Sequence, residues 1–487
     1  MRKHYDNQRR FDVTPIASLK LNYDCRDEMI PVLAGLQYVY NCPALRNKVV
    51  RLVAADVNRN SRRDIGRTGL DDWQIVVLAA VRLGCNFDYD KLQDQAENHR
   101  SLRAMLGLGE WGEGPSFGWR RIHDTICRLK PSTLEAINEA IVRCGQELDP
   151  DAAVRVRADS FVVETDIHYP TESSLIGDGL RKIIPLSAKL AKELGTTIWR
   201  QHKNELKKIQ QEIRLIAQIS SSKSPKVKAK LPAAYQALLK RAAKCLNRAR
   251  DLQKQAEIVP LTLEIVLLTG ELDRWIKLTN QVCDTAFRRV ILSENVPNSD
   301  KLFSLFEPHT QLYRRNKAKE PNQFGRMVLV FEDAAGFISH YHLMDRDATD
   351  ADVILEQTRE AQQKHDGRIE SASFDRGFYS AENEERLQEI VAQPCLPPRH
   401  PGKFAERIAE ASVEFHQQRQ RHPGIESAIG ALQAGNGLKR CRDHSEIGFE
   451  RYLGLAILGR NIHTLGKLLI AKRRGGSPAA VSKRKAA

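Results

Sequence analysis

The first third of the chain has the spacing of amphipathic helices. In the segment DDWQIVVLAAVRLG, apolar residues fall on one helical stripe, formed by Trp73, Val76, Val77, Ala80 and Val81. The segment FGWRRIHDTICRLK has a similar pattern, and Ser132 to Glu135 has the spacing of a capping box that would open the next helix. We therefore predict an all-helical domain over residues 1–150. Helical units of this size often contain a helix-turn-helix, so we expect this domain to bind DNA.

Near residue 152 the apolar residues begin to alternate with polar ones. The segment AVRVRADSFVVET predicts a strand, and residues 326–331 and 336–343 predict a hairpin around a turn at Glu332–Gly336. A helix, ADVILEQTREAQQKH, and a short strand, RIESASFD, follow. Together these elements predict an α/β core that is built from residues 151–180 and 301–470.

The segment that interrupts this core is helical and strongly basic. Two runs have the 3-4-3 spacing of a coiled-coil seam, the first through Leu206 and Ile209 and the second through Leu238 and Ala242. The segment SSSKSPKVKAKLP between them predicts a flexible turn, so residues 181–300 are expected to insert a helical hairpin. From Arg200 to Glu257 there are fifteen Lys and Arg against four Asp and Glu, a net charge of +11. This hairpin could contact DNA, form a dimerisation arm, or do both.

The overall charge favours a polyanionic partner. The chain has 76 Lys and Arg against 61 Asp and Glu, a net charge of +15. No apolar run reaches the roughly 18 residues that a membrane span needs, and the N-terminus lacks the apolar region of a secretory signal. We therefore expect a cytoplasmic protein whose partner is nucleic acid and not a membrane. Residues 471–487 predict a disordered basic tail.

The cysteines indicate neither a disulfide framework nor a structural zinc site. There are nine, an odd number, and no two of them form a CxxC pair. We expect nine reduced thiols.

Three acidic residues lie where the predicted core elements end or begin. Asp159 lies on the first strand, Asp375 ends a later strand, and Glu426 opens a helix after Pro423-Gly424. Three carboxylates that converge there could hold two divalent ions, and Mg²⁺ prefers such oxygen ligands. Two ions about 4 Å apart can activate a nucleophile and stabilise the leaving oxygen of an in-line displacement. Each carboxylate alone has an ordinary explanation, as a turn, a cap or a complement to a helix dipole.

An ordered string of sequence blocks resembles bacterial insertion-sequence transposases of the DDE type, and most closely the group called ISNCY. The blocks are RADSFVVETDIHYPTESSLIGDGLRK, FSLFEPHTQLYRRNKAKEPNQFG with the hairpin after it, SFDRGFYSAEN, and HPGIESAIGALQAGNGLKRCRDHSEIGFERYLGLAILGRNIHTLG. They cover most of residues 150–470. The resemblance implies an α/β RNase H-like catalytic core with an N-terminal all-helical domain and a helical insertion.

The resemblance also implies the site. It assigns the two catalytic aspartates to Asp159 and Asp375 and the glutamate to Glu426, as ligands of two Mg²⁺ ions for which Mn²⁺ could substitute. Asp159 would bridge both ions. Asp166 and Glu450 remain alternatives for the first and third positions.

Basic residues near these blocks are candidate DNA contacts. Gln433 stands where some relatives have a lysine, seven residues after Glu426, and nearby cations could replace it. The candidates for DNA binding are Arg120, Arg121, Arg376, Lys439, Arg440 and Arg442. His168, Tyr169 and Tyr379 also flank the acidic residues.

The resemblance implies strand cleavage at the ends of a mobile element, followed by attack of a 3′-hydroxyl on target DNA. The expected partners are double-stranded DNA, as terminal repeats and target, and further copies of the chain in a homodimer or larger assembly on DNA. Two alternatives remain: a nuclease of the same fold that does not join strands, and a non-catalytic DNA-binding protein descended from a transposase.

Overall fold

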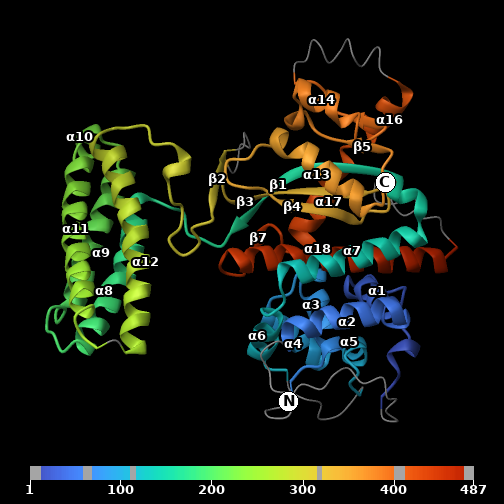
Figure 1. The fold of residues 1–487 in the computed structure, drawn as a ribbon, viewed down its shortest axis with the longest axis horizontal. Coiled ribbons are helices and arrows are strands. Elements are labelled where there is room, and N and C mark those ends of the chain that lie inside the picture. The colour runs from blue at the N-terminus through green and yellow to red at the C-terminus, as the bar shows by residue number, and fades with distance from the viewer. Residues whose placement is uncertain are drawn as a thin grey trace. The chain divides into compact units, whose positions relative to one another are not determined.

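A computed structural model describes residues 13–58, 69–109, 117–260, 262–314, 321–399 and 412–475 (Figure 1). The chain divides into two compact units. The core unit comprises the residues up to Asp166 and from Arg326 onward, and the helical unit comprises Ile167–Gly325. The insertion is therefore longer at both ends than the expected 181–300.

Helices dominate the core unit. Its N-terminal helices are α1 (Met29–Asn41), α2 (Pro43–Val57), α3 (Asp72–Gly84), α4 (Tyr89–Asn98), α5 (Arg100–Met105), α6 (Trp119–Ile126) and α7 (Pro131–Leu148). Its later helices are α13 (Asp350–Lys364), α14 (Ala381–Leu387), α16 (Val413–Arg421), α17 (Gly424–Gly435) and α18 (Glu446–Arg473). The predicted capping box at Ser132 is wrong: α7 begins at Pro131 and has no side-chain cap. Proline fixes the backbone angle of the first helical residue, so Ser132 already lies inside the helix.

One mixed sheet forms the centre of the core unit, and its short strand at residues 311–314 belongs to the helical unit. Its strands are β1 (Arg155–Thr165), β2 (Gln311–Arg314), β3 (Asn322–Asp333), β4 (Ile338–Leu343), β5 (Ser371–Ser373), β6 (Gln393–Cys395) and β7 (Arg440–Cys441). β3 pairs with β1 and, antiparallel, with β2 and β4 along different stretches. β5 runs parallel to both β1 and β6, and β7 runs parallel to the end of β1.

The predicted strand, hairpin, helix and strand are confirmed as β1, β3–β4, α13 and β5. The hairpin turn is held by the Asp333 carboxylate, which accepts hydrogen bonds from the backbone N–H groups of Ala335 and Phe337. Gly336 has φ 88°, a left-handed conformation that glycine adopts without steric cost.

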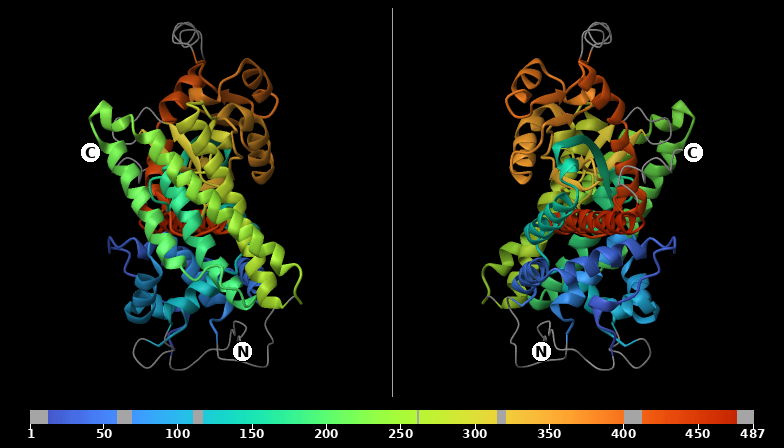
Figure 2. Two further views of the ribbon diagram at one scale, coloured as in Figure 1. Left: turned by 90° about the vertical axis from the view of Figure 1, so that its left-hand side faces the viewer. Right: turned by 90° about the vertical axis from the view of Figure 1, so that its right-hand side faces the viewer.

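The N-terminal helices share one hydrophobic core with the sheet. This core contains Val77, Ile141, Phe161, Val330 and Leu455, among others. α18 lies between the N-terminal helices and the sheet and packs on α1, α3 and α7 (Figures 1 and 2). The expected boundary at residue 150 is therefore not a boundary between separate cores. Helical periodicity reveals that a helix has an apolar face, but not which later element covers that face.

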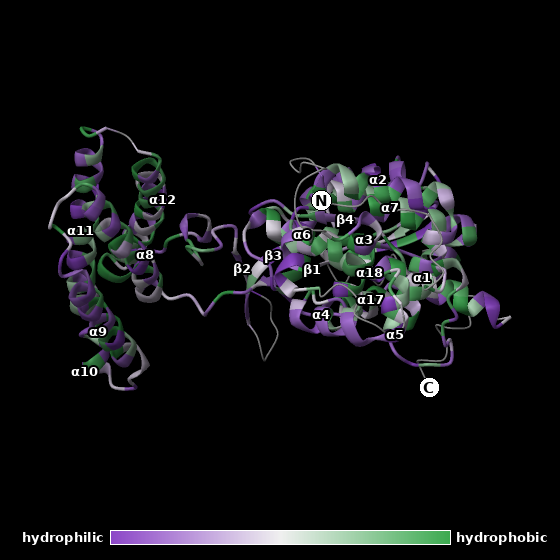
Figure 3. Cartoon of the chain, turned by 90° about the horizontal axis from the view of Figure 1, so that it is seen from below, coloured by the Kyte–Doolittle hydropathy of each residue, from purple (hydrophilic) through white to green (hydrophobic). Residues whose placement is uncertain are grey.

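The helical unit is larger than the predicted hairpin. Its long helices are α8 (Glu172–Glu193), α9 (His202–Ser221), α11 (Leu231–Ala256) and α12 (Leu263–Ala286), and the short α10 (Pro225–Lys228) lies within the predicted flexible turn. The second predicted seam is buried and the first is partly buried, with Ile209 buried and Leu206 half-buried. α8 packs on both α9 and α11, and α12 packs on α8. Outward-facing residues of α9 and α11 are largely hydrophilic (Figure 3).

The cysteines and the C-terminal residues were also the subject of predictions. All nine cysteines are free, as predicted. α18 extends to Arg473, so the first residues of the predicted tail are helical, and residues 476–487 lie outside the described part. Among the described helices, none combines the length and apolarity needed to cross a membrane.

Close helix packing yields a stability prediction. A Cβ on Gly459 of α18 would lie only 2.6 Å from the Cα of Gly84 in α3. Because backbone cannot move aside as a side-chain tip can, Gly459→Ala should lower the free energy of unfolding by about 1–3 kcal/mol in urea titrations. Gly430→Ala on α17 is the control, since a Cβ there meets nothing within 4 Å. That change should be neutral or stabilise by up to about 1 kcal/mol, and equal losses for both variants would contradict the packing argument.

Candidate active site

Asp159, within β1, and Asp375, just after the end of β5, lie side by side because their strands are parallel neighbours. Arg157 on β1 pairs with Ser373 on β5, and each aspartate follows two residues later. Neighbouring strands are about 4.8 Å apart, so the two backbone segments lie close together. Asp159 is half-buried and Asp375 is exposed.

The alternation along β1 decides which face Asp159 occupies. Val156 and Ala158 pack in the apolar cluster that includes α13, whereas Phe161 and Val163 pack in the cluster that includes Ile425 of α17. Side chains two residues apart share a face of a strand, so Asp159 lies on the face that α17 covers. On β5, Ser373 lies on this same face, because its hydroxyl contacts His422.

Glu426 lies in the first turn of α17, and Arg157 holds the start of that helix. The Arg157 guanidinium donates a hydrogen bond to the carbonyl of Arg421, 3.0 Å away. Gly424 packs directly against the guanidinium, where a Cβ would lie 2.7 Å from Cζ of Arg157. The apolar stripe predicted for this helix is confirmed, since Ile425, Ile429 and Leu432 are buried. Glu426 itself is exposed beside this anchored turn.

A buried carboxylate orients Arg157. Glu332 on β3 is only 3% exposed, and its Oε2 accepts from Nε of Arg157 at 2.6 Å. Arg460 of α18 approaches the other carboxylate oxygen at 4.0 Å. Burial raises the pKa of Glu332, while the two arginines act to lower it. The same desolvation lowers the pKa of Arg460. These three charged groups connect β1, β3 and α18 directly beneath the candidate site.

Two basic side chains accompany Asp375. The guanidinium of Arg419 lies 3.9 Å from the Asp375 carboxylate. His422 is buried, and its Nδ1 lies 3.1 Å from the Ser373 hydroxyl. Burial lowers the pKa of His422 to about 4, against a smaller opposite effect of Asp375. Neither residue was predicted from the sequence, although the run HQQRQRHPG just before Glu426 places Arg419 and His422 one helical turn apart.

The three predicted ligands thus come to one region from β1, from the end of β5 and from α17. Three carboxylates are a donor set that suits hard cations such as Mg²⁺. Within the described part of the chain, however, no three His, Cys, Asp or Glu side chains are close enough to enclose a metal ion. Like charges repel at such short range, so full convergence of the three carboxylates requires a counter-charge.

The alternative ligands lie in other surroundings. Asp166 lies beyond the end of β1 and pairs with Arg440 at 3.7 Å. Glu450 on α18 faces Tyr341 of β4 and Arg326, on the far side of β3 from β1 and β5. Its pKa is raised by burial and then by the neighbouring Glu446. These surroundings favour Asp159 and Glu426.

The predicted DNA contacts fall into two groups. Arg440 pairs with Glu164 at 3.2 Å, and the Arg442 guanidinium donates to Tyr452, to Asn86 and to the Phe87 carbonyl. Arg442 therefore fastens the segment after α17 to the turn before α4. The other four candidates differ in burial: Arg120, Arg121 and Lys439 are exposed, and Arg376, which directly follows Asp375, is half-buried.

The flanking residues are more dispersed than the sequence suggested. His168 and Tyr169 belong to the helical unit, where His168 lies 3.4 Å from Asp178 and the Tyr169 ring packs edge-on against Phe324. Tyr379 donates to Glu384 within the core unit.

The Arg157–Glu332 pair can be tested by a double-mutant cycle. Arg157→Gln should lower the free energy of unfolding by about 3–5 kcal/mol, because it leaves a buried carboxylate without its main partner. Arg157→Gln combined with Glu332→Gln should cost clearly less than the two single changes added together, measured by urea titration. Arg155→Gln, at an exposed position of the same strand, should stay within about 0.5 kcal/mol. Additive losses would show that the pair is not coupled.

His422 should make stability depend on pH. Its pKa is about 4 in the folded chain against 6.5 ordinarily, so between these values the unfolded state binds more protons. This contribution is complete above pH 6.5 and is lost progressively as pH falls towards 4. His422→Gln should therefore flatten the fall in urea midpoint between about pH 7 and 5. His416→Gln, at a half-exposed position of α16, the helix that ends just before His422, is the control, and an unchanged slope in His422→Gln would refute the assignment.

Comparisons of this chain with protein-family models, with curated proteins and with solved structures find no match.

Proposed function

We propose that this chain is a DDE-type DNA transposase of an insertion sequence with an RNase H-like catalytic core. The observation that supports this most directly is the placement of the three acidic residues. The three residues are far apart in sequence: Asp159 lies within β1, Asp375 follows the end of the neighbouring β5, and Glu426 lies in the first turn of α17, which packs on β1.

The order of the sheet supports the proposed core. β1 lies inside the sheet, the β3–β4 hairpin lies on one side of it, and the parallel strands β5 and β6 lie on the other. Helices cover both faces, with α13 and α14 on one and α17 and α18 on the other. Ligands of α/β sheets commonly bind beyond the carboxyl ends of parallel strands, which is where Asp375 follows β5.

Each residue of the site has a proposed role. Bound at the three carboxylates, two Mg²⁺ ions would supply an activated nucleophile and stabilise the leaving oxygen of the scissile phosphate. Asp159, Asp375 and Glu426 would hold these ions. Arg157 fixes the first turn of α17 and so orients Glu426. Arg419, beside Asp375, can donate to a phosphate oxygen in the same region.

The helical unit supplies the proposed surface for the DNA backbone. Exposed cations follow α9, α10 and the start of α11, at Lys203, Lys207, Lys226, Lys228 and Lys230. Two of the few acidic residues nearby, Glu205 and Glu212, already bind Arg241. The outward charge of these helices is therefore mostly unopposed, which favours phosphate contacts without base specificity.

The decisive experiment measures Mg²⁺-dependent cleavage and joining by the full chain on DNA that carries the sequences flanking its gene. Asp159→Asn, Asp375→Asn and Glu426→Gln should each lower the cleavage rate more than about a hundredfold, because even outer-shell partners of a metal are worth about 10–100-fold. Each variant should still bind DNA.

Asp166→Asn and Glu450→Gln are the matched controls and should retain cleavage. Loss of activity in a control, with activity retained in Asp159→Asn or Glu426→Gln, would reassign that ligand. Cleavage without joined products would indicate a nuclease. If the wild-type chain binds DNA but cuts none, the chain is instead a non-catalytic DNA-binding protein.

A further inference from the structure

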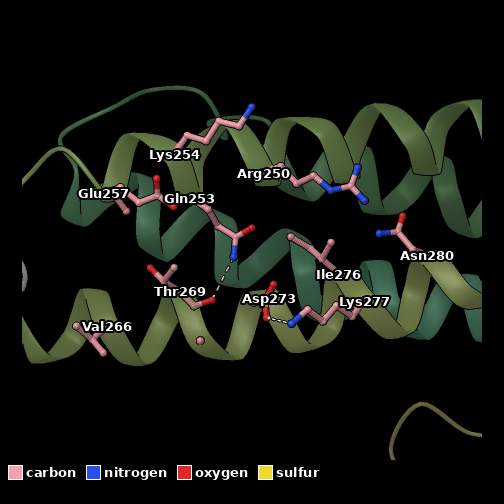
Figure 4. Close-up of a pocket in the computed structure, with 12 residues that line it drawn as sticks. Arg250, Gln253, Lys254, Glu257, Val266, Thr269, Asp273, Ile276, Lys277 and Asn280 are labelled. Atoms are coloured by element: carbon pink, nitrogen blue, oxygen red, sulfur yellow. Dashed lines mark hydrogen bonds and ion pairs between the residues drawn. The ribbon is translucent and has the colours of Figure 1, made fainter.

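A groove of about 700 Å³ lies between α11 and α12 of the helical unit (Figure 4). Arg250, Lys254 and Glu257 line it from α11, and Val266, Asp273 and Lys277 line it from α12. No step of the proposed chemistry uses this groove.

Apolar side chains stand exposed beside the groove. Leu263 is 77% exposed, Val266 49% and Leu267 64%, and they follow one another at helical spacing on the first turns of α12. Ile258, just after α11, is 84% exposed. Isolated exposed apolar residues are common, but a contiguous patch with a polar rim marks a surface that another protein covers.

The charges around this patch are balanced, unlike those of the neighbouring basic surface. Lys277 and Asp273 form an ion pair of 2.7 Å one helical turn apart, and both remain largely exposed. Glu257 likewise accompanies Lys254 and Arg250 on α11. A DNA backbone would prefer the cationic surface of α9 and α10, so the partner at the patch must be another protein surface, apolar and bearing both signs of charge.

From these observations we infer that the α12 patch is a two-fold interface with a second copy of this chain. A two-fold contact brings the same surface together twice, so its charges must complement themselves. If the two α12 helices cross antiparallel about a point between residues 273 and 277, Asp273 of each copy meets the partner's Lys277.

The same register suits two further pairs of positions on the helix. It places Gly270 opposite the partner's Asn280, and a Cβ on Gly270 would meet nothing within 4 Å, so the helices can approach closely there. It also places Leu263 opposite the partner's Phe287, and both side chains are exposed in the single chain. Apolar contact at the ends and paired charges at the centre then hold one antiparallel arrangement. The inference is independent of the chemistry at the candidate active site.

The test is a charge exchange between two variants of the full chain, without DNA, followed by sedimentation analysis. Asp273→Lys puts two lysines on the contact and Lys277→Asp puts two aspartates on it. Each variant alone should dimerise at least about tenfold more weakly than the wild type, because like charges then face each other twice. An equimolar mixture should regain dimers, since every lysine of one variant then meets an aspartate of the other.

A second pair of variants tests the apolar contact. Leu263→Glu combined with Leu267→Glu should abolish the dimer, whereas Leu215→Glu should leave it intact. Leu215 is an exposed leucine of α9, a helix that does not line the groove.

A wild-type chain that stays monomeric at tens of micromolar would overturn the inference. So would a mixture that gains no dimer while both charge variants keep their helical circular dichroism. If either charge variant loses that signal, the leucine variants decide: loss of the dimer supports the interface, and an unchanged dimer overturns it.

Discussion

The core unit depends on a charge that the protein cannot leave unpaired. Glu332 lies in the interior of the sheet, and burial of an ionised carboxylate is costly unless partners compensate for the lost water. Arg157 is the main partner of Glu332. Its guanidinium also donates a hydrogen bond to the Arg421 carbonyl, and Gly424 packs against the plane of the guanidinium. One ion pair therefore sets the position of Asp159's strand relative to the helix of Glu426. The ion pair that compensates the buried charge of Glu332 therefore also fixes the positions of the elements that carry these two acidic residues.

Around this pair, close backbone packing makes a rigid support. Gly459 of α18 meets Gly84 of α3, and Gly466 of α18 meets Pro31 of α1, at distances that exclude any side chain. The buried Arg82–Asp443 ion pair, 2.6 Å long, fastens α3 to the segment between α17 and α18. The N-terminal helices therefore stabilise the elements that present the acidic residues. Their exposed residues, including Arg120 and Arg121, remain open to a partner.

The helical unit has two surfaces that differ in where their acidic residues lie. The two glutamates of α9 bind Arg241 of α11, and Glu205 also pairs with Lys208, so cations outnumber acidic groups on the outward surface of α9 and α10. On α12 the opposite charges of Asp273 and Lys277 face outward together beside apolar residues. The first arrangement would attract a uniform polyanion. The second would favour a partner that presents apolar side chains and charges of both signs. One four-helix unit can thus serve two partners on different surfaces.

The sequence by itself determined the local elements and the candidate ligands. Periodicity predicted β1, the β3–β4 hairpin, α13 and the stripe of α17, because such patterns depend only on which face of an element is buried. The resemblance of the sequence blocks to DDE transposases, not periodicity, singled out Asp159 on β1, Asp375 after β5 and Glu426 at the start of α17. Only the tertiary structure decided that residues 1–150 share a core with the sheet, that the insertion has four long helices, and that Arg442 fastens two segments. The roles of Arg157, Glu332 and Arg419 could not be predicted either, because sequence periodicity does not show which residue a charged side chain will pair with. Those contacts join residues up to hundreds of positions apart, and chain folding alone brings them together.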